Sequence, residues 1–349
     1  MSYDCRMTPS LAYGHGAPLS RALLRAAPAD FFVAEQLAFS AEGSGEHALV
    51  SVQKTGANTA WVAEQLARFC GVSAALVSYA GMKDRHAVTQ QSFSVHLPGK
   101  PSPDFSQLQI EGVRVLGQQR HTRKLQRGAL IGNRFVITLR QVSADAEALA
   151  ARIEHIQQRG VPNYFGAQRF GHAHGNVDEA RALFAEAKRV PRHLQSIYLS
   201  AARAEIFNQV LHARVAAGFW DELIEGDVLN LAGSGSVFGP EPITELLRER
   251  AKARDLHPTG PLWGSGALRT RDLALAFETA AAQSLADLAD GLVAHRLKQE
   301  RRALRLVVGE LEHVWLEPST VKLSFTLPAG SYATTVVREL FATEAELVS

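Results

Sequence analysis

The 349-residue chain is predicted to be an α+β protein with two domains. Strand-like alternation dominates residues 31–142, long helical patterns follow, and strand-like segments return from residue 304. Strand-bearing ends that flank a helix-rich middle predict that the two ends complete one mixed sheet. We therefore expect a discontinuous domain of residues 1–158 and 306–349, interrupted by an inserted helix-rich domain of residues 159–305.

Strands are expected where apolar and polar residues alternate, because successive side chains of a strand point to opposite faces. The expected strands are residues 31–39, 47–54, 76–81, 92–97, 130–142, 227–231, 304–308 and 321–327. One helix interrupts the first group: Thr59 can cap a segment in which Val62, Leu66 and Phe69 recur at helical spacing. Further helices are expected at residues 145–158, 177–188, 195–217, 241–253, 272–289 and 331–341.

The composition is that of a folded protein, with 46% hydrophobic and 21% charged residues. No segment approaches the roughly 20 apolar residues of a membrane span, and the first residues lack a signal-peptide pattern. A cytoplasmic protein without a membrane anchor is expected. Cys5 and Cys70 stand far apart with no metal-ligand spacing, so neither a disulfide scaffold nor a zinc site is indicated.

Positive charge is concentrated in two runs, although the net charge is only +2, from 37 basic and 35 acidic residues. The first run contains Arg114, Arg120, His121, Arg123, Lys124 and Arg127 without an acid among them. The second contains Arg296, Lys298, Arg301, Arg302 and Arg305 with only Glu300. Each run is either a solvated face or a nucleic-acid contact, and the runs alone do not decide between the two.

Common motifs of other function classes fail on spacing. Residues 231–239, LAGSGSVFG, miss the phosphate-loop pattern and are expected to form a turn. His172 and His174 lack a third ligand at a metal-site spacing, so loop histidines are favoured over a metal site. The GxSxG motif of serine hydrolases, the HExxH motif of zinc proteases and the complete motif set of the β-lactamases are absent.

The most informative segment is residues 78–91, SYAGMKDRHAVTQQ, between two expected strands. Asp84 stands there among Lys83, Arg85 and His86 on a short turn, and neighbouring positive charge favours the ionised carboxylate that a nucleophile or base requires. In an extended backbone, His86 would share the face of Asp84 while Lys83 and Arg85 would point away. The alternative is an ordinary surface ion pair.

Aromatic residues stand near polar or charged residues at four places suited to binding a nucleobase: Phe31 with Asp30 and Glu35, Asn133 with Phe135, Arg169 with Tyr164, Phe165 and Phe170, and Tyr332 with Arg338. Such groups can stack on a base and hydrogen-bond its edge, and each stacked base contributes about 1 to 3 kcal/mol. Aromatic residues at strand ends are usually part of the core, and that is the alternative for Phe32, Phe135 and Phe170 taken individually.

Together these segments resemble the tRNA pseudouridine synthase D family. The resemblance rests on six blocks in order: residues 43–67, GMKDRHAVTQQ, GNRFVITLR, VPNYFGAQRFG, LSAARAEIFNQVL and PAGSYATTVVREL. It implies a catalytic domain of the pseudouridine synthase type with that family's inserted domain, and isomerisation of uridine 13 in tRNA without a cofactor or a metal. Nothing in the sequence demands an obligate protein partner, so none is expected. The resemblance also implies that Asp84 is catalytic and that Phe31, Asn133 and Tyr332 bind the substrate nucleotide. The family motif has phenylalanine where this chain has Tyr332.

The remaining basic residues are candidates for RNA contact: Lys83, Arg85, His86, Arg123, Lys124 and Arg169. Two other functions remain open. A non-catalytic RNA-binding or RNA-chaperone protein on the same scaffold would not need a carboxylate at Asp84. A sugar-acting hydrolase would need two cooperating carboxylates.

Overall fold

A computed structural model describes residues 11–126, 128–186 and 189–343. They form two compact units, which we call the sheet unit and the helical unit. The sheet unit contains residues 21–143 and 309–330, and the helical unit contains the described parts of 1–20, 144–308 and 331–349. These boundaries differ from the predicted ones because residues 144–158 and the segment after 330 pack with the helical unit. The units describe packing, so the inserted domain stays a prediction.

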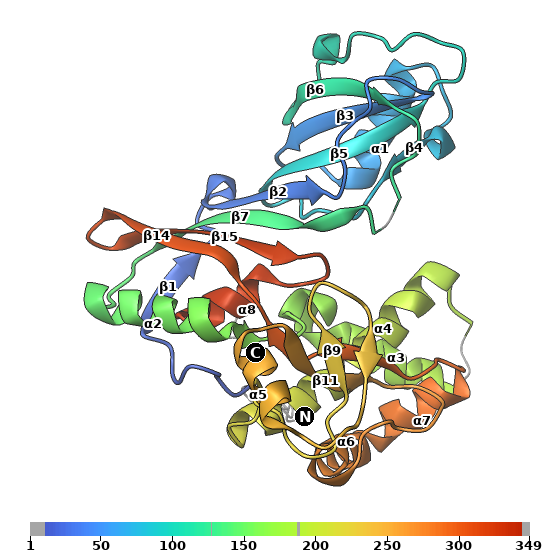
Figure 1. Ribbon diagram of the computed structural model, residues 1–349. Helices are drawn as coiled ribbons and strands as arrows, with labels where there is room; N and C mark the ends of the chain where they lie inside the picture. The colour runs from blue at the N-terminus through green and yellow to red at the C-terminus, as the bar shows by residue number, and fades with distance from the viewer. Residues whose placement is uncertain (1–10, 127, 187–188, 344–349) are drawn as a thin grey trace, which may run out of the picture. The chain divides into compact units, whose positions relative to one another are not determined.

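The sheet unit is built on one mixed sheet, shown in Figure 1, in the order β14-β15-β7-β2-β5-β3-β6, with β4 beside β5 and β1 beside β7. Strands β2 and β5 are parallel, whereas their other neighbours are antiparallel. The strands are β1 (Ser20–Leu24), β2 (Phe31–Leu37), β3 (His47–Lys54), β4 (Val77–Tyr79), β5 (Val88–His96), β6 (Val113–His121), β7 (Leu130–Arg140), β14 (Gly309–Glu317) and β15 (Thr320–Pro328). The predicted α+β class and mixed sheet are confirmed.

Helix α1 (Thr59–Phe69) covers one face of this sheet. Its Val62 and Leu66 are buried against alternating residues of β3 and β5, such as Val50 and Phe93. The expected cap is wrong by one residue: Asn58 is the N-cap and Thr59 is the first helical residue. The buried hydroxyl of Thr59 donates to Gln91 Oε1 instead.

The helical unit surrounds a four-stranded sheet of order β10-β9-β11-β12 and a separate pair, β13 with β8. Its strands are β8 (Val161–Pro162), β9 (Leu229–Leu231), β10 (Val237–Phe238), β11 (Leu256–Leu262), β12 (Glu300–Ala303), β13 (Arg305–Leu306) and β16 (Phe341–Thr343). Its helices are α2 (Ala146–Arg159), α3 (Gly175–Glu186), α4 (Arg192–Ala216), α5 (Glu245–Lys252), α6 (Asp272–Ser284), α7 (Ala286–Ala294) and α8 (Ala333–Arg338). No described helix is long and apolar enough to cross a membrane.

Helix α4 is the central element of this unit. Its small residues Ala201 and Ala204 are fully buried, which lets α3, α6 and α7 pack closely against it. Near its end, Arg214 forms a two-fold hydrogen-bonded pair with Asp227 inside the core. Removal of either partner would leave an uncompensated buried charge, which typically costs about 3 to 5 kcal/mol.

The single helix expected at residues 272–289 is two helices. Leu285 has φ −127° and ψ 42°, so it ends α6 and precedes α7. The hydroxyl of Ser284 donates to the carbonyl of Ala281, a local bond that competes with continuation of the helix. The alanine-rich sequence favours helix on both sides and conceals the break.

Candidate active site

Asp84 lies in the turn between β4 and β5. Its Oδ1 accepts a hydrogen bond of 2.9 Å from the backbone N–H of His86. An aspartate that accepts from the backbone two residues ahead stabilises a tight turn and orients its own carboxylate. The side chain is 31% exposed, so Asp84 is neither in the core nor fully solvated.

Arg25 joins Asp84 to Phe31. Its Nη1 lies 3.2 Å from Asp84 Oδ2, and its guanidinium carbon lies 4.4 Å from the centroid of the Phe31 ring. Arg25 adopts a positive φ of 63° just after β1, a conformation that few residues with a side chain adopt. The cation holds the carboxylate beside an aromatic face, which brings two predicted site residues together.

The backbone of the turn is held from inside the protein by Lys54. This side chain is fully buried at the end of β3, and its Nζ donates to the carbonyls of Ala57, Lys83 and Asp84 at 2.9, 3.3 and 3.3 Å. Burial lowers the pKa of Lys54, and the negative charge of Asp84 acts in the opposite direction. A buried ammonium that bonds only to carbonyl groups fixes the backbone at Asp84.

Two further side chains hold the start of the turn. Thr59 Oγ1 accepts from the backbone N–H of Lys83 at 3.0 Å, and Gln91 Nε2 donates to the carbonyl of Gly81 at 2.6 Å. Thr59 and Gln91 are themselves hydrogen-bonded and buried. Helix α1 and strand β5 therefore both position this loop, and a network whose members are all paired is rigid.

Glu35 is the second carboxylate near this loop, and it is fully engaged. Lys83 Nζ lies 2.6 Å from Glu35 Oε1, while Oε2 accepts from the backbone N–H of Ser92 at 3.0 Å. The Glu35 and Lys83 side chains are only 2% and 10% exposed. The Lys83 ammonium is thus already paired within the protein. Its contact with RNA stays a prediction.

Asn133 lies directly opposite Glu35 in the pairing of β7 with β2. Directly opposed residues of neighbouring strands project from the same face, and alternation puts Phe31 on that face as well. Asn133 Oδ1 is buried without a hydrogen-bond partner among the described residues. An unpaired buried amide oxygen is unusual and suits a group that awaits a ligand. Phe31 itself is 5% exposed and packs edge-on against Phe135 at 6.4 Å.

Tyr332 belongs to the helical unit, where it is the N-cap residue of α8. Its hydroxyl accepts from Arg169 Nε at 2.9 Å, and Arg169 Nη1 donates to Ser200 Oγ at 3.1 Å. The ring packs edge-on against Phe165 at 5.9 Å. The hydroxyl that distinguishes this chain from the family motif is therefore used to orient Arg169, and the two predicted residues of this unit lie together.

The other basic candidates lie on the surface. Arg85 and His86 are exposed, and Arg85 Nε donates to His86 Nε2. Arg123 and Lys124 are exposed in the loop after β6, while Arg127 lies outside the described residues. His174, one of the two histidines considered above as metal ligands, is hydrogen-bonded to Glu205 and stacks on Phe170. Within the described part of the chain, no group of three or more His, Cys, Asp or Glu residues is arranged to hold a metal ion.

Sequence patterns missed Arg25 and Lys54, two charged side chains that contact Asp84 itself: Arg25 pairs with its carboxylate, and Lys54 donates to its backbone carbonyl. Each is a single basic residue far from position 84 in the sequence, and neither lies in a charge cluster. The sequence holds one indirect indication for Lys54, which is the last residue of a strand whose alternate residues are apolar and buried. A lysine at the next position of that series is expected to be buried and therefore paired.

Comparisons with known proteins give matches over nearly the whole chain. The sequence profile of tRNA pseudouridine synthase D (TruD) matches residues 12–186 and 175–340. The protein named tRNA pseudouridine synthase D from Xanthomonas axonopodis pv. citri (strain 306) is 50% identical in an alignment that covers 95% of this chain and 95% of its own. The protein of that name from Methylococcus capsulatus is 47% identical over 97% of this chain and 96% of its own.

A solved structure shares the fold. The crystal structure of a putative tRNA pseudouridine synthase D from Methanosarcina mazei superposes with a TM-score of 0.73 over 97% of each chain, at 23% identity. The predicted pseudouridine synthase type of fold is therefore confirmed as well. The sequence matches, which cover nearly the whole chain at about half identity, place this protein in the tRNA pseudouridine synthase D family.

Proposed function

We propose that this protein isomerises uridine 13 of tRNA to pseudouridine, with Asp84 as the catalytic group. The observation that carries the proposal is the placement of Asp84: a partly exposed carboxylate, ion-paired with Arg25 on a turn anchored by Lys54. The names of the relatives supply the reaction and the kind of RNA.

The reaction requires uracil to leave C1′ of its ribose, turn, and rejoin through C5. An ionised Asp84 can attack C1′, or it can remove a ribose proton to give a glycal. In either route Arg25 orients the carboxylate. The freed base must be retained and water excluded, because water would hydrolyse the intermediate.

The target nucleotide is proposed to contact Phe31, Asn133 and Tyr332. Extrusion of a stacked base costs a few kcal/mol, which stacking and edge hydrogen bonds offset. The unpaired Oδ1 of Asn133 is an acceptor suited to an N–H on the edge of uracil. Phe31 and Tyr332, which are 5% and 7% exposed, would stack on the base or form a wall beside it.

A hydrolase is disfavoured by the state of Glu35. A hydrolytic glycosidase needs a second carboxylate to activate water. Both oxygens of Glu35 are occupied by Lys83 and Ser92, and its side chain is nearly buried.

Incubation with unmodified tRNA, followed by digestion to nucleosides, separates the candidate functions. Pseudouridine supports the proposal, free uracil indicates a hydrolase, and unchanged uridine indicates a binding protein.

Asn133→Ala is expected to reduce kcat/KM about 10-fold to 100-fold with little change in melting temperature. The reason is that Asn133 Oδ1 has no described protein partner to lose. Single-turnover assays and thermal melts measure the two effects. Gln119→Ala, at an exposed position of β6, should leave both unchanged. An equal loss of stability would instead assign Asn133 a structural role.

Reversing charge at both Arg123 and Lys124 to Glu is expected to weaken tRNA binding and to flatten its salt dependence. Each lost phosphate contact should reduce the slope of log K against log salt by about 0.7 to 0.9. Binding titrations at several salt concentrations test this. Reversal of Arg248 and Lys252 on α5 is the control with the same charge change. An unchanged slope would identify the Arg123 loop as a solvated face.

A further inference from the structure

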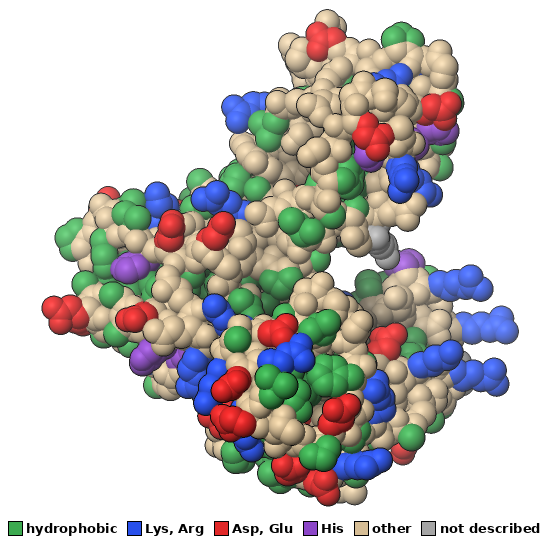
Figure 2. Space-filling view, in the orientation of Figure 1, with side chains coloured by type: hydrophobic (Ala, Val, Ile, Leu, Met, Phe, Trp, Pro, Cys, Tyr) green, Lys and Arg blue, Asp and Glu red, His purple; other side chains and the backbone are tan. Residues whose placement is uncertain are grey.

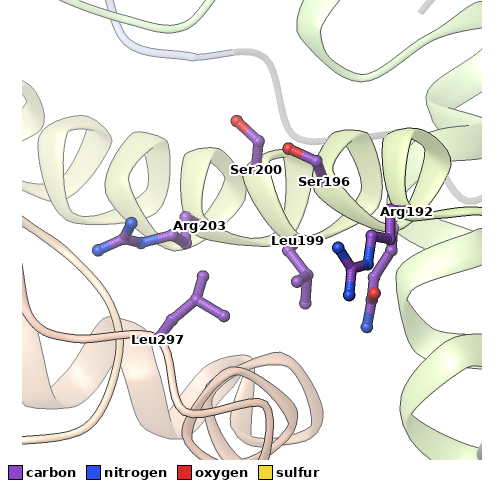
Figure 3. A pocket seen from close by; sticks show the side chains of 7 residues that line it. Arg192, Ser196, Leu199, Ser200, Arg203 and Leu297 are labelled. Carbon is purple, nitrogen blue, oxygen red and sulfur yellow. The ribbon is translucent and has the colours of Figure 1, made fainter.

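A cavity of about 470 Å³ lies along one face of α4 in the helical unit. Its described lining residues are Arg192, Gln195, Ser196, Leu199, Ser200, Arg203 and Leu297. The six residues from α4 are spaced by three, four, seven, eight and eleven positions, which puts them on one helix face. Figure 3 shows Leu199 and Leu297 pointing toward each other, with Arg192 and Arg203 at opposite ends.

The cavity combines an apolar floor with positive charge. Leu199 and Leu297 are partly buried against the core of the helical unit. Two of the described lining residues are arginines and none is acidic. Figure 2 shows Lys and Arg side chains gathered over α3 and α4 on the same unit. A groove that offers both a cation and an apolar surface can contact the two parts of single-stranded RNA that proteins bind, its phosphates and its base faces.

The two arginines have different roles. Arg203 is 15% exposed and holds the segment that carries Leu297: its Nη2 donates to the carbonyls of Leu262 and Lys298, and its Nη1 pairs with Glu300. Its Nε is buried without an acceptor among the described residues, so this lining residue has one N–H donor that is not hydrogen-bonded there. Arg192 is exposed and stands at the opposite end of the cavity from Arg203 (Figure 3). Arg192 is therefore the cation available to a phosphate.

The cavity is connected to a proposed substrate residue within the same unit. Ser200, one of the lining residues, accepts from Arg169, and Arg169 donates to the hydroxyl of Tyr332. Ser200 and Arg192 are eight residues apart on α4, or about 12 Å along the helix axis. A nucleotide at Tyr332 and a phosphate at Arg192 are thus separated by a short stretch of a strand.

We propose that the α4 cavity binds the RNA strand that flanks the target nucleotide, with a phosphate at Arg192 and a base over Leu199 and Leu297. The proposal rests on the proposed function, because it takes the target nucleotide to lie at Tyr332 and the flanking RNA to continue from there. Gln195 and Ser196 lie beside the apolar floor and supply hydrogen-bonding groups for a base edge.

The test is tRNA binding by the full-length chain carrying Arg192→Ala or, separately, Ser196→Glu. Arg192→Ala is expected to raise Kd about fivefold to tenfold and to reduce the salt slope by about 0.7 to 1. Ser196→Glu adds a negative charge at an exposed helical position and is expected to raise Kd at least as much. Melting temperatures verify that both variants are folded.

Arg248→Ala and Gln283→Glu repeat these charge changes at exposed positions of α5 and α6, and both should bind tRNA like the wild type. Wild-type Kd and salt slope in either cavity variant would overturn the proposal. Pseudouridine formation by the wild type is measured separately. Its absence would refute the proposed function, whereas the binding data alone decide whether the cavity holds RNA.

Discussion

Asp84→Asn is expected to reduce pseudouridine formation by about 10³-fold or more, because an amide can neither attack C1′ nor remove a ribose proton. The fold should survive. Asn retains the oxygen that accepts from the His86 N–H, and the lost ion pair with Arg25 is one-third exposed on both sides, which corresponds to about 0 to 1 kcal/mol. Affinity for tRNA should change little. Quantification of nucleosides after single turnover, beside a binding titration, measures both.

Asp104→Asn is a closely matched control. Asp104 also accepts from the backbone N–H two residues ahead, that of Ser106, and so it has the same local turn geometry on an exposed loop of the same unit. This variant should keep full activity. Substantial turnover by purified Asp84→Asn would remove Asp84 from the catalytic role, and a large loss of melting temperature would show that the carboxylate acts structurally.

The fold class follows from the sequence because periodicity reports which faces are buried. Strand β3 was predicted with its observed limits, since its alternate residues are apolar and buried. Strand β11 was missed: its Pro258 and Pro261 argue against a strand, yet Pro261 lies opposite Arg301 in the pairing with β12. Strands β6 and β14 were also missed, because they are largely exposed and their polar residues carry little pattern.

The site could be predicted only in part. Asp84, Phe31 and Asn133 were singled out because each stands in a recognisable local motif. Arg25, which connects two of them, has no such motif. Its contacts arise from the meeting of a segment after β1 with a turn before β5, and pairing between segments so far apart leaves no trace in local periodicity. The role of Tyr332 in orienting Arg169 likewise depends on a tertiary contact.

Lys54→Met is expected to reduce kcat about 10-fold to 100-fold. Loss of Nζ frees the carbonyls of Lys83 and Asp84, so the backbone that carries the carboxylate can shift, and a displacement of about 1 Å can reduce turnover 100-fold. Unpaired buried carbonyls destabilise the fold by about 1 to 3 kcal/mol each, and removal of a buried charge offsets part of this. Assays therefore belong well below the melting temperature of the variant.

A positioning role differs from a purely structural one in what it leaves unchanged. Lys54→Met should lower kcat while the Kd for tRNA stays near that of the wild type, because the Lys54 side chain is fully buried and inaccessible to a ligand on the surface. Lys100→Met removes the same charge from an exposed position and should leave kcat unchanged. Wild-type kcat in folded Lys54→Met would mean that Thr59 and Gln91 suffice to hold the turn. Their hydrogen bonds to the turn reach only Lys83 and Gly81, so they would have to fix Asp84 through the backbone of Lys83.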